Sequence, residues 1–487
     1  MEFNYDVIII GAGISGINVA YHVQTELPNY SYIILEERAA MGGTWDLFRY
    51  PGIRSDSDLI TYGFSWYPWN QSRPIAEGKA IAAYIKEAAA QHGIDQHIYF
   101  QHRVARATWS DTKQKWTLIV EHAGVEKLYT ATFVAFGTGY YDYNQSLPAD
   151  IPGIDQFTGS LIQPQFWPKG VNYTGQKIVV IGSGATAVTL IPKLAETAER
   201  VTMLQRSPTY ILSVPNAEIK KTCIDYLLPR TIARSYHRLS WFLPHRLFFL
   251  FCQSFPHFSR RLLRWRMIKE LPANIAHDPH FNPRYAPWDQ RLCVSPDGDF
   301  YQALYTGKVD IKTDSIEAVT SSGIKLKSGE FLDADIIITA TGLKLRLAGG
   351  VKLEIDKEPC NLAEKYLWRG VMLQDVPNAF FFIGYTNASW TLGVDASATF
   401  STRLMKHLSS KNATAAVPRV PTRLKLQPRR VLDLSSTYIT KADKDMPKAA
   451  DQGPWLPRSN YISDLWFAKY GRLDDLEIIA QHEVGKN

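Results

Sequence analysis

The 487-residue chain has few cysteines and no long hydrophobic run. Its four cysteines, at positions 223, 252, 293 and 360, form no Cys-x-x-Cys pair and no metal-ligand spacing, so we expect neither a redox disulfide nor a bound metal. This cysteine usage fits a reduced, cytoplasmic compartment. No stretch approaches the ~20 apolar residues that a membrane-spanning helix needs. The acidic first residues, Met-Glu-Phe-Asn-Tyr-Asp, are typical of a first strand rather than a secretory signal.

Charge and composition describe a large folded protein without a nucleic-acid signature. The sequence is 45% hydrophobic and 21% charged, and its length predicts two or three domains. The net charge of +7 at pH 7 can attract a phosphorylated cofactor or an acidic membrane surface, and it is equally ordinary for solubility. Lysine and arginine form no dense block, so we expect no nucleic-acid partner.

A glycine-rich turn follows the first expected strand. The run Gly11-Ala12-Gly13-Ile14-Ser15-Gly16 lies between a β-branched strand at 5–10 and a segment of helical spacing at 14–24. The next strand, 31–35, ends at Glu36, whose carboxylate can accept both ribose hydroxyls of a dinucleotide. The glycines permit a tight turn and a close approach to pyrophosphate, which the helix N-terminus attracts. This βαβ unit predicts a first dinucleotide site.

A second turn of the same kind, Gly182-Ser183-Gly184-Ala185-Thr186-Ala187, follows a strand at 177–181. After the next strand, 201–204, Gln205-Arg206-Ser207 stands where an acidic residue would bind a ribose. Arg206 can pair with a 2′-phosphate that an acid would repel, so we expect NADPH rather than NADH at this site. The alternative is that Arg206 is an ordinary surface arginine. Two such sites in one chain indicate a flavin and a nicotinamide held face to face.

The remaining pattern predicts an α/β fold with two dinucleotide-binding (Rossmann-like) domains, of which the flavin domain is split in sequence. We expect a further helix at 77–91 and further strands at 116–121, 131–136, 334–338 and 380–384. The strand at 131–136 ends in Gly137-Thr138-Gly139, a backbone that can approach a bound ring closely. The polar tail after Pro418 is expected to wrap back on the first domain.

The predicted domains follow from these elements. They are an FAD-binding part at 1–147, an NADP-binding domain at 148–340 with a helical insertion at about 215–287, and a second FAD-binding part with the C-terminal tail at 341–487.

A longer signature lies between the two turns. Gly43-x-Trp45 runs on to Tyr50-Pro51-Gly52 and Asp56, and Phe157-x-Gly159 precedes Trp167-Pro168. With Pro287–Cys293 and Gly384–Thr391, these motifs resemble those of type I Baeyer–Villiger monooxygenases, within the flavin-containing monooxygenase superfamily, over nearly the whole chain. The sequence departs from the family pattern at Gln163, where the second signature has a histidine. Glutamine exchanges hydrogen bonds but carries no charge near neutral pH, so we expect position 163 to orient the interdomain linker rather than to move protons.

The resemblance implies cofactor contacts for a defined set of residues. The expected FAD contacts are Gly11, Gly13, Ser15, Gly16, Glu36, Thr44, Trp45, Asp46, Leu47, Asp56 and the backbone of Val104. The expected NADP(H) contacts are Arg54, its neighbour Ser55, Gly182, Ser183, Gly184, Ala185, Thr186, Ala187, Arg206 and Ser207. Arg291 and Asp56 match the catalytic pair of the family, with Asp56 holding the guanidinium through paired hydrogen bonds. The residues alone also allow a structural salt bridge for Arg291 and a turn or cap role for Asp56.

The implied activity is an FAD- and NADPH-dependent monooxygenation. One oxygen atom of O2 would enter an apolar ketone, giving an ester or lactone, or a thioether or thioamide, by way of a C4a-(hydro)peroxyflavin, with Arg291 stabilising the developing charge. The alternative is a flavin monooxygenase limited to sulfur or nitrogen, which Gln163 keeps open. A disulfide reductase would need a cysteine pair that the sequence lacks, and a non-enzymatic nucleotide sensor is the remaining possibility.

One segment, Trp241–Met267, combines Trp, Phe and Leu with Arg260, Arg261, Arg264 and Arg266. It is either a helical cover over an apolar substrate cavity with its arginines in water, or a weak contact with a membrane surface, which would make the protein peripheral. The sequence does not indicate an oligomeric state.

Overall fold

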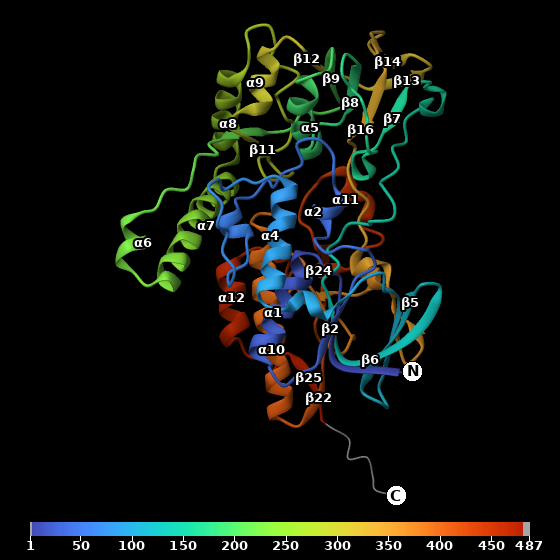
Figure 1. Ribbon diagram of the computed structural model, residues 1–487, viewed down its shortest axis with the longest axis vertical. Coiled ribbons are helices and arrows are strands. Elements are labelled where there is room, and N and C mark those ends of the chain that lie inside the picture. Colours follow the sequence, from blue (N-terminus) through green and yellow to red (C-terminus); the bar gives the residue numbers. More distant parts are fainter. Residues whose placement is uncertain (1, 481–487) are drawn as a thin grey trace, which may run out of the picture.

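The computed structural model describes residues 2–480; Met1 and residues 481–487, at the outer ends of the first and last predicted domain ranges, lie outside the described residues. Two sheets with parallel cores organise the molecule and lie toward opposite ends of its long axis (Figure 1). Helices and loops occupy the region between them.

The first sheet has a parallel core in the order β3–β2–β1–β6–β21. These strands are β1 (Glu2–Ile10), β2 (Tyr32–Leu35), β3 (Ile98–Tyr99), β6 (Val125–Phe136) and β21 (Ala379–Phe381). The long β6 also begins an extension of four strand pairings, which are antiparallel except for the third, which is parallel. Its strands are β5 (Lys115–His122), β4 (Arg103–Ser110), β17 (Lys352–Ile355) and β18 (Glu358–Pro359), while β19 (Leu367–Trp368) and β20 (Met372–Leu373) join through β21.

The second sheet is five-stranded and wholly parallel, in the order β12–β9–β8–β16–β7. Its strands are β7 (Ser160–Ile162), β8 (Lys177–Ile181), β9 (Arg200–Gln205), β12 (Val309–Thr313) and β16 (Ile336–Thr339). Smaller pairings complete the strands: β10 (Ile211–Val214) with β11 (Cys293–Pro296), β13 (Ile316–Thr320) with β14 (Gly323–Leu326) and β15 (Phe331–Asp333), β22 (Ala413–Pro418) with β25 (Leu476–Ala480), and β23 (Pro428–Arg430) with β24 (Lys448–Ala450).

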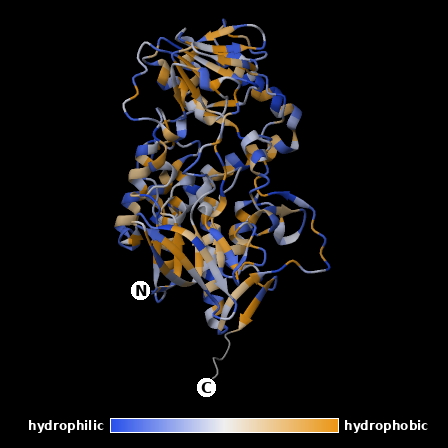
Figure 2. Ribbon diagram, turned by 90° about the vertical axis from the view of Figure 1, so that its right-hand side faces the viewer, coloured by the Kyte–Doolittle hydropathy of each residue, from blue (hydrophilic) through white to orange (hydrophobic). Residues whose placement is uncertain are grey.

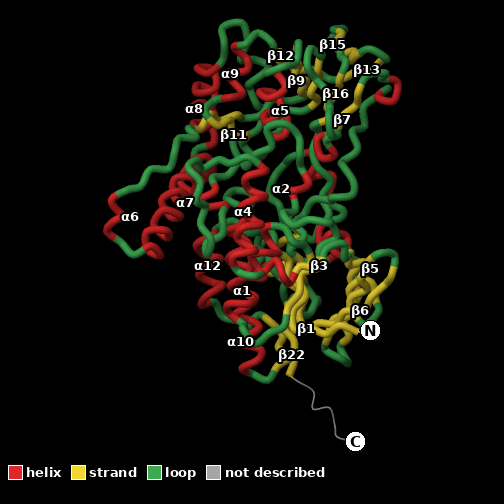
Figure 3. Tube along the Cα trace, in the orientation of Figure 1, coloured by secondary structure: helices red, strands yellow, loops and turns green. Residues whose placement is uncertain are grey.

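Helices accompany both sheets and gather on one side of the molecule (Figure 3). Near the first sheet lie α1 (Ile14–Glu26), α2 (Thr44–Leu47), α3 (Leu59–Tyr62), α4 (Gly78–Gln91), α10 (Trp390–Ser410), α11 (Thr437–Ala442) and α12 (Tyr461–Tyr470). The second sheet has α5 (Ala185–Ala195) and α9 (Asp299–Tyr305), and the insertion contributes α6 (Cys223–Leu227), α7 (Arg230–Ser254) and α8 (Pro256–Glu270). Short 3₁₀ turns are Ile94–His97, Ile154–Gln156, Pro164–Phe166, Leu347–Gly350, Leu362–Glu364 and Gly453–Trp455. In the described chain no helix is long and apolar enough to cross a bilayer.

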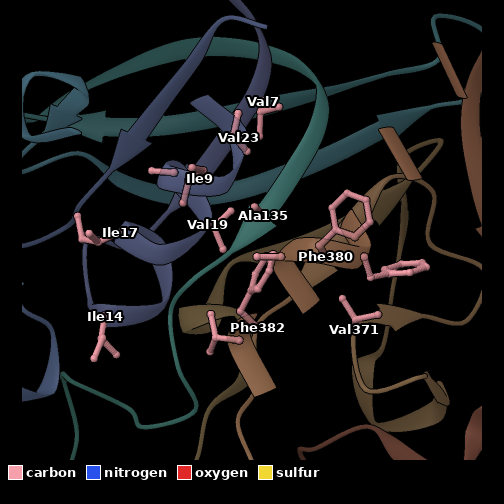
Figure 4. Close-up of a cluster of buried hydrophobic side chains, with 14 of the residues drawn as sticks. Val7, Ile9, Ile14, Ile17, Val19, Val23, Ala135, Val371, Phe380 and Phe382 are labelled. Atoms are coloured by element: carbon pink, nitrogen blue, oxygen red, sulfur yellow. The ribbon is translucent and has the colours of Figure 1, made fainter. Parts of the chain in front are cut away.

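The core explains why β1 is a continuous apolar run. Val7 and Ile9 point to one face of the sheet, where they pack with Ile17 and Val23 of α1, and Ile8 and Ile10 point to the other (Figure 4). Successive side chains of a strand alternate between faces, so a strand covered on both sides is apolar throughout. Figure 2 shows the strands of this sheet as mostly hydrophobic arrows among helices and loops of mixed hydropathy.

The α/β fold class predicted from the sequence is confirmed, and the strand expected at 177–181 is found as β8. The exact domain boundaries remain a prediction. The tail packs on the first sheet through α12 and α10, as expected, but it also reaches further. The amide of Ser435 donates to the carbonyl of Asp289, at 2.8 Å, so the tail is anchored to the loop that carries Arg291.

Candidate functional site

The first glycine turn connects β1 to α1 and leaves no room for a side chain at Gly16. A Cβ at Gly16 would lie 1.8 Å from the carbonyl oxygen of Gly11, so any larger residue would force the helix away from the strand. Helix α1 begins after Gly13 without a side-chain cap. Its first amides therefore keep their donor capacity, and Gly13, Ile14 and Ser15 line a cavity. Such an uncapped N-terminus is suited to a pyrophosphate.

Glu36 lies at the end of β2 and ties the turn to the sheet. Its carboxylate accepts hydrogen bonds from the amides of Ala12, at 2.7 Å, and Arg38, at 2.9 Å. Burial raises the pKa of Glu36, and the two amide bonds oppose that rise. Glu36 also borders the cavity, as the predicted ribose contact requires. Val104, in contrast, is buried in β4 near this strand end, because the amide of His102 bonds to the Glu36 carbonyl at 2.9 Å.

The signature loop after Gly43 is fixed by aromatic and charged partners. The Thr44 hydroxyl lies 2.9 Å from the hydroxyl of Tyr143, and the Trp45 indole donates to Tyr62 at 2.8 Å. Asp46 faces away from the cavity and pairs with Arg38 at 2.6 Å.

Two other predicted FAD contacts differ in their surroundings. Leu47 packs at the edge of the second sheet's core rather than on the cavity wall. Ser15 accepts a hydrogen bond from the indole of Trp390, at 2.9 Å, so the start of α10 is fastened to the first turn.

The second glycine turn has the same construction. Gly182 has a φ of 134°, and a Cβ there would lie 2.3 Å from the carbonyl oxygen of Ala340. At Gly184 a Cβ would meet no atom within 4 Å, so the backbone faces open space at the uncapped start of α5. The Ser183 hydroxyl donates to the carbonyl of Ser207 at 2.9 Å, which joins the turn to the end of β9.

One cavity of about 1300 Å³, counted with its open mouth, is bordered by both turns. Of the predicted site residues it contacts Gly11, Gly13, Ser15, Glu36, Thr44, Trp45, Arg54, Ser55, Asp56, Ala185, Thr186 and Arg291. The others lie behind or beside its wall: Gly16, Asp46, Leu47, Val104, Gly182, Ser183, Gly184, Ala187, Arg206 and Ser207. The structure thus brings the two nucleotide motifs and the expected catalytic pair to a single space.

The charges of Asp56 and Arg291 influence each other's pKa, although the two side chains form no direct hydrogen bond or ion pair in the described chain. Burial raises the pKa of Asp56, and the charges of Arg291 and Arg54 oppose that rise. Burial by itself would lower the pKa of Arg291, but Asp56 and the neighbouring tyrosines raise it overall. Within the described chain, no hydrogen bond or ion pair joins Asp56 to Arg291, so the paired hydrogen bonds implied by the resemblance are not formed in this structure. Both side chains border the cavity.

Arg54 has a partner that the sequence did not indicate. Its guanidinium pairs with the Asp299 carboxylate at the start of α9, and one of the two bonds measures 3.2 Å. The pair connects the signature loop to the second sheet's helices. Arg54 still borders the cavity beside the second turn, where a nicotinamide nucleotide was expected.

Arg206 and Gln163 lie outside this cavity. Arg206 is exposed after β9 and donates to the hydroxyl of Thr437 at 3.3 Å. Gln163 directly follows β7, and its carbonyl accepts a hydrogen bond from the amide of Phe166 at 3.1 Å. The side chain of the nearby Gln165 donates to the carbonyl of Asp142, at 2.6 Å, which fastens the linker to the first sheet's loops.

Several cavity residues were not anticipated from the sequence. They are aromatic: Tyr62, Tyr140, Tyr141, Tyr143, Tyr385 and Trp390. Three of the tyrosines directly follow Gly137-Thr138-Gly139, the run expected to approach a bound ring, and this proximity was the available signal.

Comparison with known proteins identifies the family. The family described as "Flavin-binding monooxygenase-like" matches residues 4–348 of this chain. The chain belongs to this family. The FAD-containing monooxygenase EthA of Mycolicibacterium smegmatis is 44% identical over 98% of this chain and 96% of its own length. The probable FAD-binding monooxygenase AlmA of Acinetobacter baylyi is 41% identical over 98% and 96%. The predicted enzyme class, a flavin monooxygenase, is confirmed by this membership.

Solved structures of this flavin monooxygenase fold cover both chains almost completely. A steroid monooxygenase bound to NADP aligns with a TM-score of 0.77 over 98% of this chain and all of the other, at 20% identity. A cyclohexanone-bound cyclohexanone monooxygenase aligns with a TM-score of 0.75 over 99% of this chain, at 19% identity. At this identity the likeness supports the fold.

Proposed function

We propose that this flavin monooxygenase uses FAD and NADPH to insert one oxygen atom of O2 into apolar ketones and to oxygenate thioethers or thioamides. The observation that carries the proposal is the single cavity that joins both glycine turns, Asp56 and Arg291. A flavin and a nicotinamide must meet in one space for electrons to pass between them, and this chain provides one space for both.

The residues present fit both nucleotides. The uncapped start of α1, the crowded Gly16 and the carboxylate of Glu36 suit the pyrophosphate and ribose of FAD. The open backbone at Gly184 and the exposed Arg206 suit NADPH. Bound there, the flavin would supply the activation of O2 with electrons from NADPH.

Arg291 is the proposed catalytic residue. Its permanent charge, set in a largely buried cavity with Asp56 nearby, would stabilise negative charge that develops on oxygen during transfer to the substrate. Asp56 acts on the guanidinium through space, and a bound ligand would decide whether the two side chains close into a direct pair. The aromatic wall excludes water and accommodates an apolar substrate.

The proposed ketone substrates are suggested by the names of similar proteins. A cyclohexanone monooxygenase holds the ketone cyclohexanone on a fold of this kind. Gln163 supports the second candidate, a monooxygenase limited to sulfur or nitrogen, because it replaces the histidine of the ketone-oxidising signature.

The four cysteines are free, which supports a reduced cytoplasmic location. The domain division at 1–147, 148–340 and 341–487 is part of the same proposal, and the two parallel sheets support it.

A product assay tests the proposal. The purified, FAD-loaded protein is incubated with NADPH and a panel of apolar ketones, thioethers and thioamides, and both NADPH consumption and product mass are followed. We expect esters or lactones with one added oxygen atom, together with sulfoxides. Sulfoxides without any ester would favour the second candidate, and NADPH consumption with hydrogen peroxide as the sole product would contradict both.

A further inference from the structure

The outer face of α7 carries an apolar stripe that residues 2–480 leave uncovered. Of its 25 residues, the structure buries Ala233, Phe242 and Cys252. A second set repeats every three or four positions, which places it on one side of the helix, and all its members are exposed: Ile232, Tyr236, Leu239, Leu243, Leu247 and Leu250. Leu247 is 56% exposed. Protein surfaces rarely leave such a continuous apolar face in water without a partner.

A parallel stripe on α12 adjoins it. Ile462, Trp466 and Tyr470 recur at four-residue spacing and are exposed, Trp466 by 61%. Ile462 and Tyr470 border the same groove as Leu239 of α7. The two helices are held together at this point, since the ring centroids of Phe242 and Tyr461 lie 5.5 Å apart and Arg246 donates to the Ser459 carbonyl at 2.9 Å.

The adjoining α6 and α8 extend the face. Tyr226 and Leu227 of α6 are 75% and 77% exposed, and this helix projects from the body of the molecule (Figure 1). On α8 the exposed apolar residues Phe258, Trp265 and Ile268 alternate with exposed basic residues, and the Lys269 ammonium lies 3.8 Å from the centre of the Trp265 ring. Aromatic rings next to cationic side chains are typical of the lipid headgroup boundary.

Basic residues dominate the charge of these helices. Among their acidic residues, Asp225 pairs with His237, Asp464 pairs with Arg458, and Glu270 is the last residue of α8. The sequence from Tyr226 to Lys269 contains no aspartate or glutamate. It contains Arg230, Arg234, Arg238, Arg246, Arg260, Arg261, Arg264, Arg266 and Lys269. Arg238 is neutralised by Asp395, at 2.7 Å, whereas Arg261, Arg264 and Arg266 are exposed. An apolar surface edged by unneutralised cations is complementary to an anionic bilayer. A helix that only covers a cavity would expose polar rather than apolar residues to water.

We propose that the exposed faces of α6, α7, α8 and α12 form a docking surface for an anionic phospholipid bilayer. The apolar stripes enter the boundary between headgroups and acyl chains, and the arginines of α8 contact lipid phosphates. The helices lie on the bilayer rather than across it, because none in the described chain is long and apolar enough to span it.

The inner face of α7 connects this surface to the cofactor cavity. Phe242 packs in a buried cluster with Tyr385, which borders that cavity. Phe249 meets Trp288 edge to face, with ring centroids 5.4 Å apart, in the loop that leads to Arg291. This part of the inference rests on the proposed function: an apolar substrate dissolved in the bilayer would reach the cavity beside α7.

Vesicle co-sedimentation tests the docking surface without reference to oxygenation. FAD-loaded protein is mixed with vesicles of phosphatidylcholine alone or of phosphatidylcholine with phosphatidylglycerol, and the bound fraction is measured at low and high salt. We expect at least about tenfold stronger partition into the anionic vesicles, reduced by salt, because each basic residue near such a surface contributes to binding. Absence of binding, or equal binding to both vesicles, would overturn the proposal.

Two variants and a matched control locate the surface. Leu243→Glu with Leu247→Glu should reduce partition by at least about tenfold, and so should Arg261→Gln with Arg264→Gln, which leaves the apolar stripe intact should the first variant fail to fold. Val125→Glu with Tyr305→Glu changes two residues that are 59% and 63% exposed elsewhere, and it should bind as the unchanged protein does. Flavin absorbance and NADPH oxidation should be the same in all of them.

Two further results would distinguish the docking surface from an interface between copies of the chain and from the proposed function. If the leucine variant turned a dimer into a monomer on a sizing column while vesicle binding was absent, the face would belong to a second copy of the chain. If vesicles bound the protein but no oxygenated product formed from any substrate, the docking surface would stand and the proposed function would fail.

Discussion

At the scale of single residues, Arg291 is the position where the proposed chemistry depends most on one side chain. Arg291→Ala should retain FAD and its reduction by NADPH, because it leaves both glycine turns unchanged, but ester formation should fall by ~10²–10³, the usual effect of removing a preorganised charge. Stopped-flow flavin absorbance and ester yield separate the two steps. Arg284→Ala, an exposed arginine seven positions earlier, is the matched control and should change neither. Normal ester yield in Arg291→Ala would remove this residue from the mechanism.

A substitution at Gln163 tests whether the histidine of the family signature takes part in the reaction. The residue lies outside the cavity, at the end of β7. We therefore expect Gln163→His to change turnover by less than about tenfold, or ~1.4 kcal/mol of activation free energy. The measurement is kcat with a ketone and with a thioether. A much larger gain confined to the ketone would show that a protonatable group is needed here.

Arg206 should determine the choice of nicotinamide. Arg206→Ala removes a cation from the end of β9, so KM for NADPH should rise by about tenfold or more, as expected for a lost charge-assisted hydrogen bond, while KM for NADH stays nearly constant. Steady-state kinetics with both nucleotides give the ratio. The loss of the Thr437 contact is tested by Thr437→Val, which keeps the arginine and should preserve the NADPH preference.

At the scale of elements, the two glycine turns give opposite expectations for the same substitution. Gly16→Ala places a methyl group 1.8 Å from a carbonyl oxygen, and we expect it to destabilise the FAD region by about 1–3 kcal/mol and to yield protein with little flavin. Gly184→Ala meets no protein atom within 4 Å, so its thermal midpoint should be unchanged while KM for NADPH rises. Thermal unfolding and NADPH kinetics distinguish them. Equal destabilisation by both changes would contradict the open backbone at Gly184.

These same elements show what a sequence can predict. The strand at 177–181 consists mainly of β-branched residues and ends at Gly182, so its position can be predicted from neighbouring residues alone. The pairing of Arg54 with Asp299 joins positions 245 apart, and no local pattern encodes it. The separation of Asp56 from Arg291 is equally a product of packing, and the expected paired hydrogen bonds are not formed in this structure. The tyrosines that follow Gly139 line the cavity because of how the loop after β6 packs, and spacing alone does not place them there.

At the scale of the whole molecule, the Arg54–Asp299 pair connects the signature loop of the first nucleotide site to the start of α9 beside the second sheet. The side chains are 11% and 29% exposed, and the Arg54 Nε is buried without a further partner in the described chain. Removing one member therefore leaves a poorly solvated charge. Asp299→Asn should lower the free energy of unfolding by about 1–3 kcal/mol, measured by urea denaturation of the FAD-loaded protein.

The control for this pair is another salt bridge of the second sheet that water already surrounds. Arg200 and Asp310 lie 3.4 Å apart with side chains 65% and 48% exposed. Because solvent screens that pair, Asp310→Asn should cost less than about 1 kcal/mol. The two residue changes are chemically identical, so their difference isolates burial and the connection between the nucleotide sites. An equal effect of both substitutions would mean that the Arg54–Asp299 pair does not hold the two halves of the cavity together.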